Sequence, residues 1–209
     1  MGRTEFLLLL LLLAVEAPAF AAPPLSSTVV VRVFNYAGVP AEQLAEGRRT
    51  AADAFNRVGI AIRWIDCRVP HGEMGAACTE PLEVGRELML RLVDAVSPER
   101  RDLARGLALG TSMLDRENRE GVLMTVDLRP MHRIGRETAT AVETLLGRAI
   151  AHEIGHLLLG SAEHPREGLM RALWSRDELR GLKPAHWQFS PTEGAQMRQG
   201  LAQRQQATN

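Results

Sequence analysis

Short apolar runs alternate with amphipathic stretches along the chain, and this pattern predicts strands and helices in succession. Residues 28–34 are β-branched and apolar apart from one arginine, which is typical of a strand. Residues 40–58 begin with a proline and place apolar side chains on one face of a helix, and Gly59 follows as a helix end. Residues 60–65 then alternate in the manner of a second strand.

The middle of the chain adds two strands and one long helix to this prediction. Residues 88–93 form a third strand, with a helix starting at Glu83 as the alternative, and residues 122–128 form a fourth. A broad apolar side then extends from about Glu137 to Leu159, as expected of a largely buried helix. This order of elements predicts an α+β fold, an α/β sandwich in which the long helix packs on a twisted mixed sheet.

Near the C-terminus the pattern changes to short helices with clear starting signals. Ser175 and Glu178 match a capping box, in which a serine and a glutamate three residues later cap the first turn of a helix. Ser190 and Glu193 match a second capping box. We therefore expect a small helical C-terminal lobe.

The first 21 residues have the pattern of a secretory signal peptide. Arg3 precedes an uncharged apolar run over residues 6–15, and residues 19–21 place small side chains at the spacing that a signal peptidase reads. This run is shorter than the roughly 20 apolar residues that span a bilayer, although an uncleaved anchor remains the alternative. We expect residues 22–209 to form a single exported domain, secreted or periplasmic, with no membrane anchor after signal cleavage.

Composition narrows the range of partners. The chain has 25 Lys and Arg residues against 25 Asp and Glu residues, and it contains no basic run. This balance gives no electrostatic reason to expect nucleic acid or an anionic membrane as a partner. The chain also shows no serine or cysteine nucleophile arrangement and no phosphate loop. We expect a monomer.

Two cysteines occur in the chain, Cys67 and Cys78. In an oxidising compartment they would most simply form a disulfide, which at this loop size contributes about 3 kcal/mol. The alternative is a thiolate that binds a metal as a latency switch, but no pro-segment motif accompanies either cysteine.

Candidate chemistry is concentrated in one short stretch. His152 and His156 are four residues apart, so a helix presents both imidazoles on one face, with Glu153 beside them. This HExxH pattern is typical of a zinc site that activates water, with the glutamate as general base. Gly160 is a natural helix end, and the chain reversal there would bring His164 back as a third ligand.

The third ligand is open from the residues alone. His164 precedes Pro165, which favours an extended conformation over a longer helix and supports the histidine. Zinc also accepts carboxylates, and four lie within reach in the sequence: Glu163, Glu167, Asp177 and Glu178.

The same stretch resembles the active site of the metzincin zinc metalloproteases, most closely the matrixin-like pattern. The resemblance is carried by His152, Glu153, Gly155, His156, Gly160, His164 and Met170. The family pattern HExxHxxGxxH has its glycine one position earlier and its third histidine two positions earlier than this chain. The resemblance implies a metzincin-like fold, Zn²⁺ bound by His152, His156 and His164, Glu153 as the base, and Met170 in a Met-turn beneath the metal.

The resemblance also implies a function. It implies a secreted zinc-dependent endopeptidase that acts on peptide or protein substrates, with part of residues 121–128 pairing with extended substrate by β-augmentation. Two alternatives remain open: a non-catalytic secreted zinc-binding protein that retains the fold, and a gluzincin-type peptidase with a glutamate as third ligand.

Overall fold

The computed structural model describes the chain in five ranges: residues 27–67, 74–94, 109–115, 117–181 and 183–207. The signal peptide expected over residues 1–21 lies outside the described residues. Within these ranges, none of the helices combines the length and hydrophobicity needed to cross a membrane.

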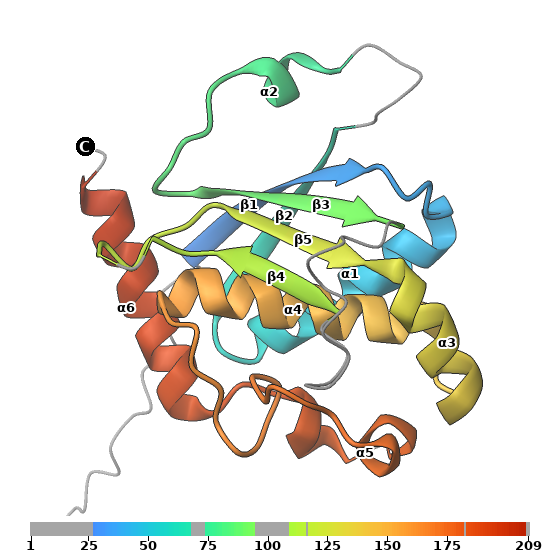
Figure 1. Cartoon of the computed structure of the whole chain (residues 1–209). Coiled ribbons are helices and arrows are strands. Elements are labelled where there is room, and N and C mark those ends of the chain that lie inside the picture. Colours follow the sequence, from blue (N-terminus) through green and yellow to red (C-terminus); the bar gives the residue numbers. More distant parts are fainter. Residues whose placement is uncertain (1–26, 68–73, 95–108, 116, 182, 208–209) are drawn as a thin grey trace, which may run out of the picture.

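A five-stranded sheet in the order β2-β1-β3-β5-β4 forms the upper layer of the molecule (Figure 1). Its strands are β1 (Ser27–Asn35), β2 (Ile60–Asp66), β3 (Glu87–Val93), β4 (Gly110–Met113) and β5 (Leu123–Asp127). The neighbouring pairs β2-β1, β1-β3 and β3-β5 are parallel, whereas β4 runs antiparallel to β5 at one edge. The sheet is therefore mixed, as predicted.

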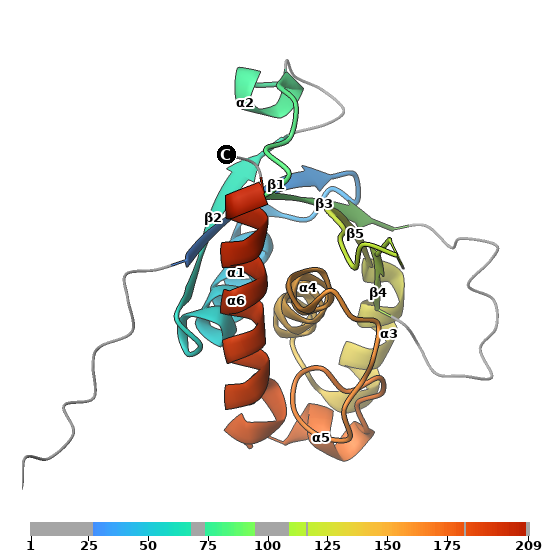
Figure 2. The same cartoon turned by 90° about the vertical axis from the view of Figure 1, so that its left-hand side faces the viewer.

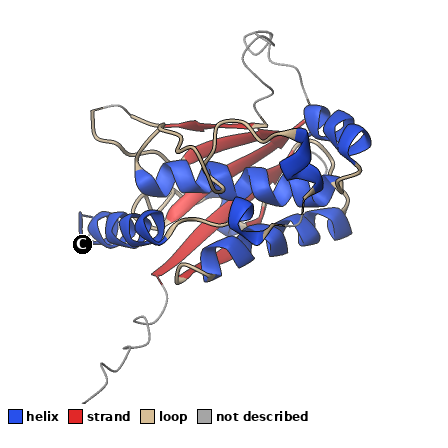
Figure 3. Cartoon of the chain, turned by 90° about the horizontal axis from the view of Figure 1, so that it is seen from below, coloured by secondary structure: helices blue, strands red, loops and turns tan. Residues whose placement is uncertain are grey.

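The main helices lie below this sheet (Figures 1 and 3). The long ones are α1 (Ala41–Asn56), α3 (Leu128–Thr138), α4 (Val142–Leu159) and α6 (Pro191–Ala207), and the short ones are α2 (Ala76–Thr79), α5 (Arg176–Arg180) and a 3-10 helix (Pro184–Trp187). Figure 2 shows α4 end-on, with the sheet above it and the segment around α5 below it. The predicted sandwich of a mixed sheet on a long helix is confirmed.

The start predicted for the long helix was wrong. The structure has two helices here, because α3 ends at Thr138 and Ala139 takes a left-handed conformation with φ 55°. The chain then starts α4 at Val142. The Asp127 side chain caps the start of α3 by accepting a hydrogen bond from the backbone N–H of Arg129.

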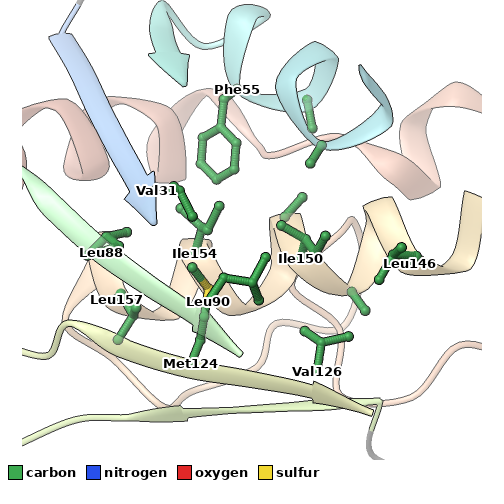
Figure 4. Packing of buried hydrophobic residues seen from close by; sticks show 14 of the residues in the cluster. Val31, Phe55, Leu88, Leu90, Met124, Val126, Leu146, Ile150, Ile154 and Leu157 are labelled. Atoms are coloured by element: carbon green, nitrogen blue, oxygen red, sulfur yellow. The ribbon is translucent and has the colours of Figure 1, made fainter. Parts of the chain in front are cut away.

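Helix α4 is held by apolar contacts on its sheet side. In Figure 4, Leu90, Met124 and Val126 of the sheet face Ile150 and Ile154 of α4, and all five side chains are fully buried. Each buried side chain of this size contributes about 1.5–3 kcal/mol. Helix α4 is thus a rigid platform for the side chains on its opposite face.

Two glycines allow α1 and α4 to approach closely. A Cβ on Gly147 would overlap the carbonyl oxygen of Gly47 and lie 2.5 Å from Cβ of Thr50. The helices would have to separate, so we expect Gly147→Ala to lower the free energy of unfolding by about 1–3 kcal/mol in a denaturant titration. Gly75→Ala is the matched control, because nothing lies within 4 Å of a Cβ there. Equal losses in both variants would contradict this account of the packing.

The connection between β2 and β3 is anchored to the sheet at two points. Cys67 and Cys78 form a disulfide with a Cα–Cα distance of 5.6 Å. Arg32 of β1 donates to the backbone carbonyl of Glu80 at 2.6 Å and forms a buried ion pair with Glu87. These contacts hold the α2 segment over the sheet face opposite α4 (Figure 1).

Both predicted capping boxes are confirmed. Ser175 accepts a hydrogen bond from the backbone N–H of Glu178, whose carboxylate accepts from the backbone N–H of Ser175 at 2.7 Å. Ser190 and Glu193 make the same reciprocal pair at the start of α6. The helices of the C-terminal lobe therefore begin where their sequence signals lie.

Candidate metal centre

Helix α4 carries the motif and ends directly after it. Gly160 takes a left-handed conformation with φ 58°, and its backbone N–H donates to the carbonyl of His156. A Cβ at this position would overlap the backbone oxygen of Arg119, so glycine is required for space as well as for conformation. The chain reverses at Gly160 and returns His164 to the helix.

Three histidines converge at the end of this reversal. The ligand nitrogens of His152, His156 and His164 all lie within 4.8 Å of one another. Nε2 of His156 lies 3.0 Å from Nε2 of His152 and 3.1 Å from Nε2 of His164. The carboxylates of Glu163, Glu167, Asp177 and Glu178 do not belong to this cluster. Glu178 instead pairs with Arg171 and caps α5.

The hydrogen bonds of the two helical histidines determine what their Nε2 atoms can do. Nδ1 of His152 lies 2.9 Å from the carbonyl oxygen of Leu169, and Nδ1 of His156 lies 2.7 Å from that of Ser161. A carbonyl only accepts, so each Nδ1 carries the proton, and each Nε2 presents a lone pair. Two lone pairs 3.0 Å apart repel unless a cation lies between them.

This donor set fits zinc. Tetrahedral zinc with Zn–N bonds of about 2.0–2.1 Å separates its nitrogen ligands by about 3.3 Å, close to the separations described here. Burial lowers the pKa of His152 to about 4, and burial also lowers the pKa of His156 and of His164. All three imidazoles are therefore neutral near pH 7, which is the form that binds a metal.

The turn around Met170 lies against α4 at the middle of the motif. A Cβ on Gly155 would lie 2.5 Å from the sulfur of Met170 and 3.0 Å from Cε1 of Phe189. Gly168, with φ 81°, opens this turn, and Leu169 supplies the carbonyl that orients His152. The absence of a side chain at Gly155 thus lets the Met170 turn support the histidines from beside the helix.

Glu153 is 5% exposed and contacts the edge strand β4. The hydroxyl of Ser112 lies 2.6 Å from Oε2 of Glu153, and a Cβ on Gly110 would overlap Oε1. Sequence reasoning missed both residues, because Gly110 to Met113 is a short polar stretch with no strand pattern. No signal in the sequence links either residue to the motif.

A cleft with a volume of about 690 Å³ opens beside the histidines and Glu153. Its apolar wall comes from the residues that flank β4, from α3 and α5, and from the turn after Met170: Leu109, Leu114, Ile134, Leu173, Trp174 and Leu179. The site is therefore a hollow with one polar, metal-binding side and one apolar side.

Trp174 joins the cleft to a second tryptophan, and both rings are half-buried. Its ring lies edge-on to His152, with 5.9 Å between centroids, and it contacts Trp187 at 5.2 Å. The guanidinium of Arg148 lies over the ring of Trp187, with its central carbon 3.4 Å from the ring centroid. Burial lowers the pKa of Arg148 to about 10, so this side chain keeps its charge near pH 7.

The two other histidines that the structure describes lie outside the cluster. His132 is exposed on α3, and His186 is half-buried in the 3-10 helix. His71 lies outside the described residues.

The strand expected to pair with substrate does not suit that role. Both sides of β5 are already paired, with β3 on one side and β4 on the other. Strand β4 is the edge of the sheet next to the cleft, and Gly110, Thr111 and Ser112 line that cleft. Within the described sheet, the edge strand beside the histidines is therefore β4 and not the strand within residues 121–128.

Comparison with known proteins gives a fold-level likeness. No family model matches the sequence, and a comparison with curated proteins found no match. Among solved structures, the chain is similar to a zinc-dependent peptidase from Methanocorpusculum labreanum, with 14% identity, a TM-score of 0.51, and coverage of 80% of this chain and 99% of that one. The fold is similar to that of a zinc peptidase.

A second solved structure gives the same result. Metalloproteinase-II from Bacteroides fragilis matches with 14% identity and a TM-score of 0.50, covering 86% of this chain and 55% of that one. The chain thus spans about half the length of this second structure. At this level of identity the two likenesses establish the fold.

Proposed function

We propose that this protein is a secreted or periplasmic zinc-dependent endopeptidase of metzincin-like form. One observation carries the proposal: the Nε2 lone pairs of His152 and His156 point toward each other, and Nε2 of His164 lies beside that of His156. The buried carboxylate of Glu153 lines the same cleft. The fold-level likeness to zinc peptidase structures supports this interpretation.

In this mechanism His152, His156 and His164 would hold a zinc ion. Zinc supplies Lewis acidity, which polarises a carbonyl and makes water a stronger acid. The carbonyls of Leu169 and Ser161 fix the tautomer and orientation of two of the imidazoles.

Glu153 handles the protons in this mechanism. Its carboxylate takes a proton from the attacking water and later delivers that proton to the leaving amine. Glu153 does not belong to the metal-binding cluster, and its carboxylate lines the same cleft as the three histidines.

The substrate is an extended peptide. Strand β4 is the edge strand of the described sheet beside the cleft, and an extended peptide can be added at a sheet edge by β-augmentation. The apolar wall that includes Leu173 and Trp174 suits an apolar side chain near the cleaved bond. Glu137 and Arg176 also line the cleft. The carboxylate of Glu137 forms an ion pair with the guanidinium of Arg176.

Metal removal and peptide cleavage test the proposal together. We expect the purified protein with one equivalent of zinc to cleave members of a diverse peptide mixture, with new termini detected by mass spectrometry. Stripping the metal with a chelator should abolish cleavage, and added zinc should restore it, because water activation needs the ion. Stoichiometric zinc binding without any cleavage would favour the non-catalytic zinc-binding alternative.

A further inference from the structure

The carboxylate of Glu153 is contacted by the edge strand β4. Oγ of Ser112 lies 2.6 Å from Oε2 of Glu153 and 2.8 Å from the main-chain oxygen of the same residue. A serine hydroxyl has one proton, and a carboxylate is a stronger acceptor than a carbonyl. The shorter distance is also typical of a hydroxyl that donates to a carboxylate.

Gly110 meets the other oxygen of this carboxylate. Alternate residues of a strand face the same side, so Gly110 and Ser112 both face α4. A Cβ at position 110 would overlap Oε1 of Glu153 and lie 2.5 Å from its Cγ. The missing side chain at position 110 therefore leaves the space that the carboxylate occupies.

These contacts define the carboxylate cradle, which consists of Gly110 and Ser112. A glutamate side chain has three rotatable bonds, and a general base must reach its proton at hydrogen-bonding distance. A misplacement of about 1 Å can lower a rate by roughly 100-fold. A fixed orientation of the Glu153 carboxylate should therefore raise the rate of the reaction.

We propose that Gly110 and Ser112 are positioning residues for Glu153, so that the strand that pairs with the substrate also sets the orientation of the general base. This inference rests on the proposed peptidase function. Strand β4 would then contact both the general base and the substrate backbone. The cradle therefore fixes the position of Glu153 relative to the substrate. A purely structural role, in which Ser112 only ties β4 to α4, is the competing explanation.

Steady-state kinetics separates these two explanations. We expect Ser112→Ala to lower kcat by about 10- to 100-fold, the effect of losing one hydrogen bond to a charged group. KM should stay within about twofold, because the substrate backbone pairs with β4 through main-chain groups. Ser112→Thr keeps the hydroxyl and should recover most of kcat. Gly110→Ala should also lower kcat, because the new methyl group displaces the carboxylate.

Two controls make the result specific. Zinc affinity, measured by competition with a chromophoric chelator, should be the same in Ser112→Ala and in the unchanged protein. In a Glu153→Ala background, Ser112→Ala should cause no further loss of activity, because residues that act as a unit are not additive. A further loss in that background would overturn the inference and favour a structural role.

An unfolding experiment tests the contact without any activity. In the metal-free protein, the destabilisation by Ser112→Ala and by Glu153→Ala should be non-additive in a double-mutant cycle. If the unchanged protein cleaves peptides and Ser112→Ala has the same kcat, the inference is wrong and the peptidase proposal stands. If the unchanged protein binds zinc and cleaves nothing, the peptidase proposal fails and the inference fails with it.

Discussion

Replacement of His156 with alanine is expected to abolish stoichiometric zinc binding. Nε2 of His156 faces the Nε2 atoms of both other histidines, so His156 is central to the cluster. Even loss of a hydrogen bond behind a metal ligand costs about 10- to 100-fold in affinity, and loss of the ligand itself should exceed that. Competition with a chromophoric chelator and metal analysis of the dialysed protein measure the effect.

A histidine outside the cluster provides the control for this prediction. His132 is exposed on α3, and His132→Ala should bind zinc as the unchanged protein does. His164→Ala identifies the third ligand, since it should also weaken binding strongly. Unchanged zinc affinity in His164→Ala would instead support a carboxylate ligand of the gluzincin type.

Replacement of Glu153 with alanine should separate metal binding from hydrolysis. The three imidazoles are untouched, so we expect zinc to bind with nearly unchanged affinity. Peptide cleavage should fall by about 100- to 10,000-fold, the usual contribution of a general base. Quantification of cleaved peptides measures the loss of activity, and a chelator titration of the same sample measures the zinc affinity.

Glu153→Gln is the more conservative test of the same role. The amide keeps the shape of the side chain and can still accept a hydrogen bond from Ser112, but it cannot take a proton from water. It should therefore lose activity as Glu153→Ala does, with less effect on folding. Full activity in either variant would mean that Glu153 is not the base and that the proposed mechanism is wrong.

The features that could be predicted from the sequence depend on local signals. The spacing of His152 and His156 places both on one face of any helix, and the left-handed Gly160 follows from the cost of that conformation for other residues. The capping boxes at Ser175 and Ser190 are equally local. The structure has these features because the interactions that produce them span only three or four residues.

The features that could not be predicted depend on contacts between distant segments. Strand β4 is four residues long and exists because β5 pairs with it, and its contact with Glu153 joins residues 41 positions apart. Gly110 and Ser112 carry no periodic pattern of their own. The helix break at Ala139 has no signal in the sequence, because apolar side chains continue on both sides of it.

The position of β4 at the edge of the described sheet bears on self-association as well as on substrate binding. An edge strand can act as a template for an extended chain, including a second copy of the same protein, and Met113 on this strand is 63% exposed. Natural proteins limit that hazard by keeping edge strands very short. With only four residues, β4 offers few hydrogen-bonding positions, which is enough for a short peptide held also by a cleft but too little for a stable pairing of two sheets.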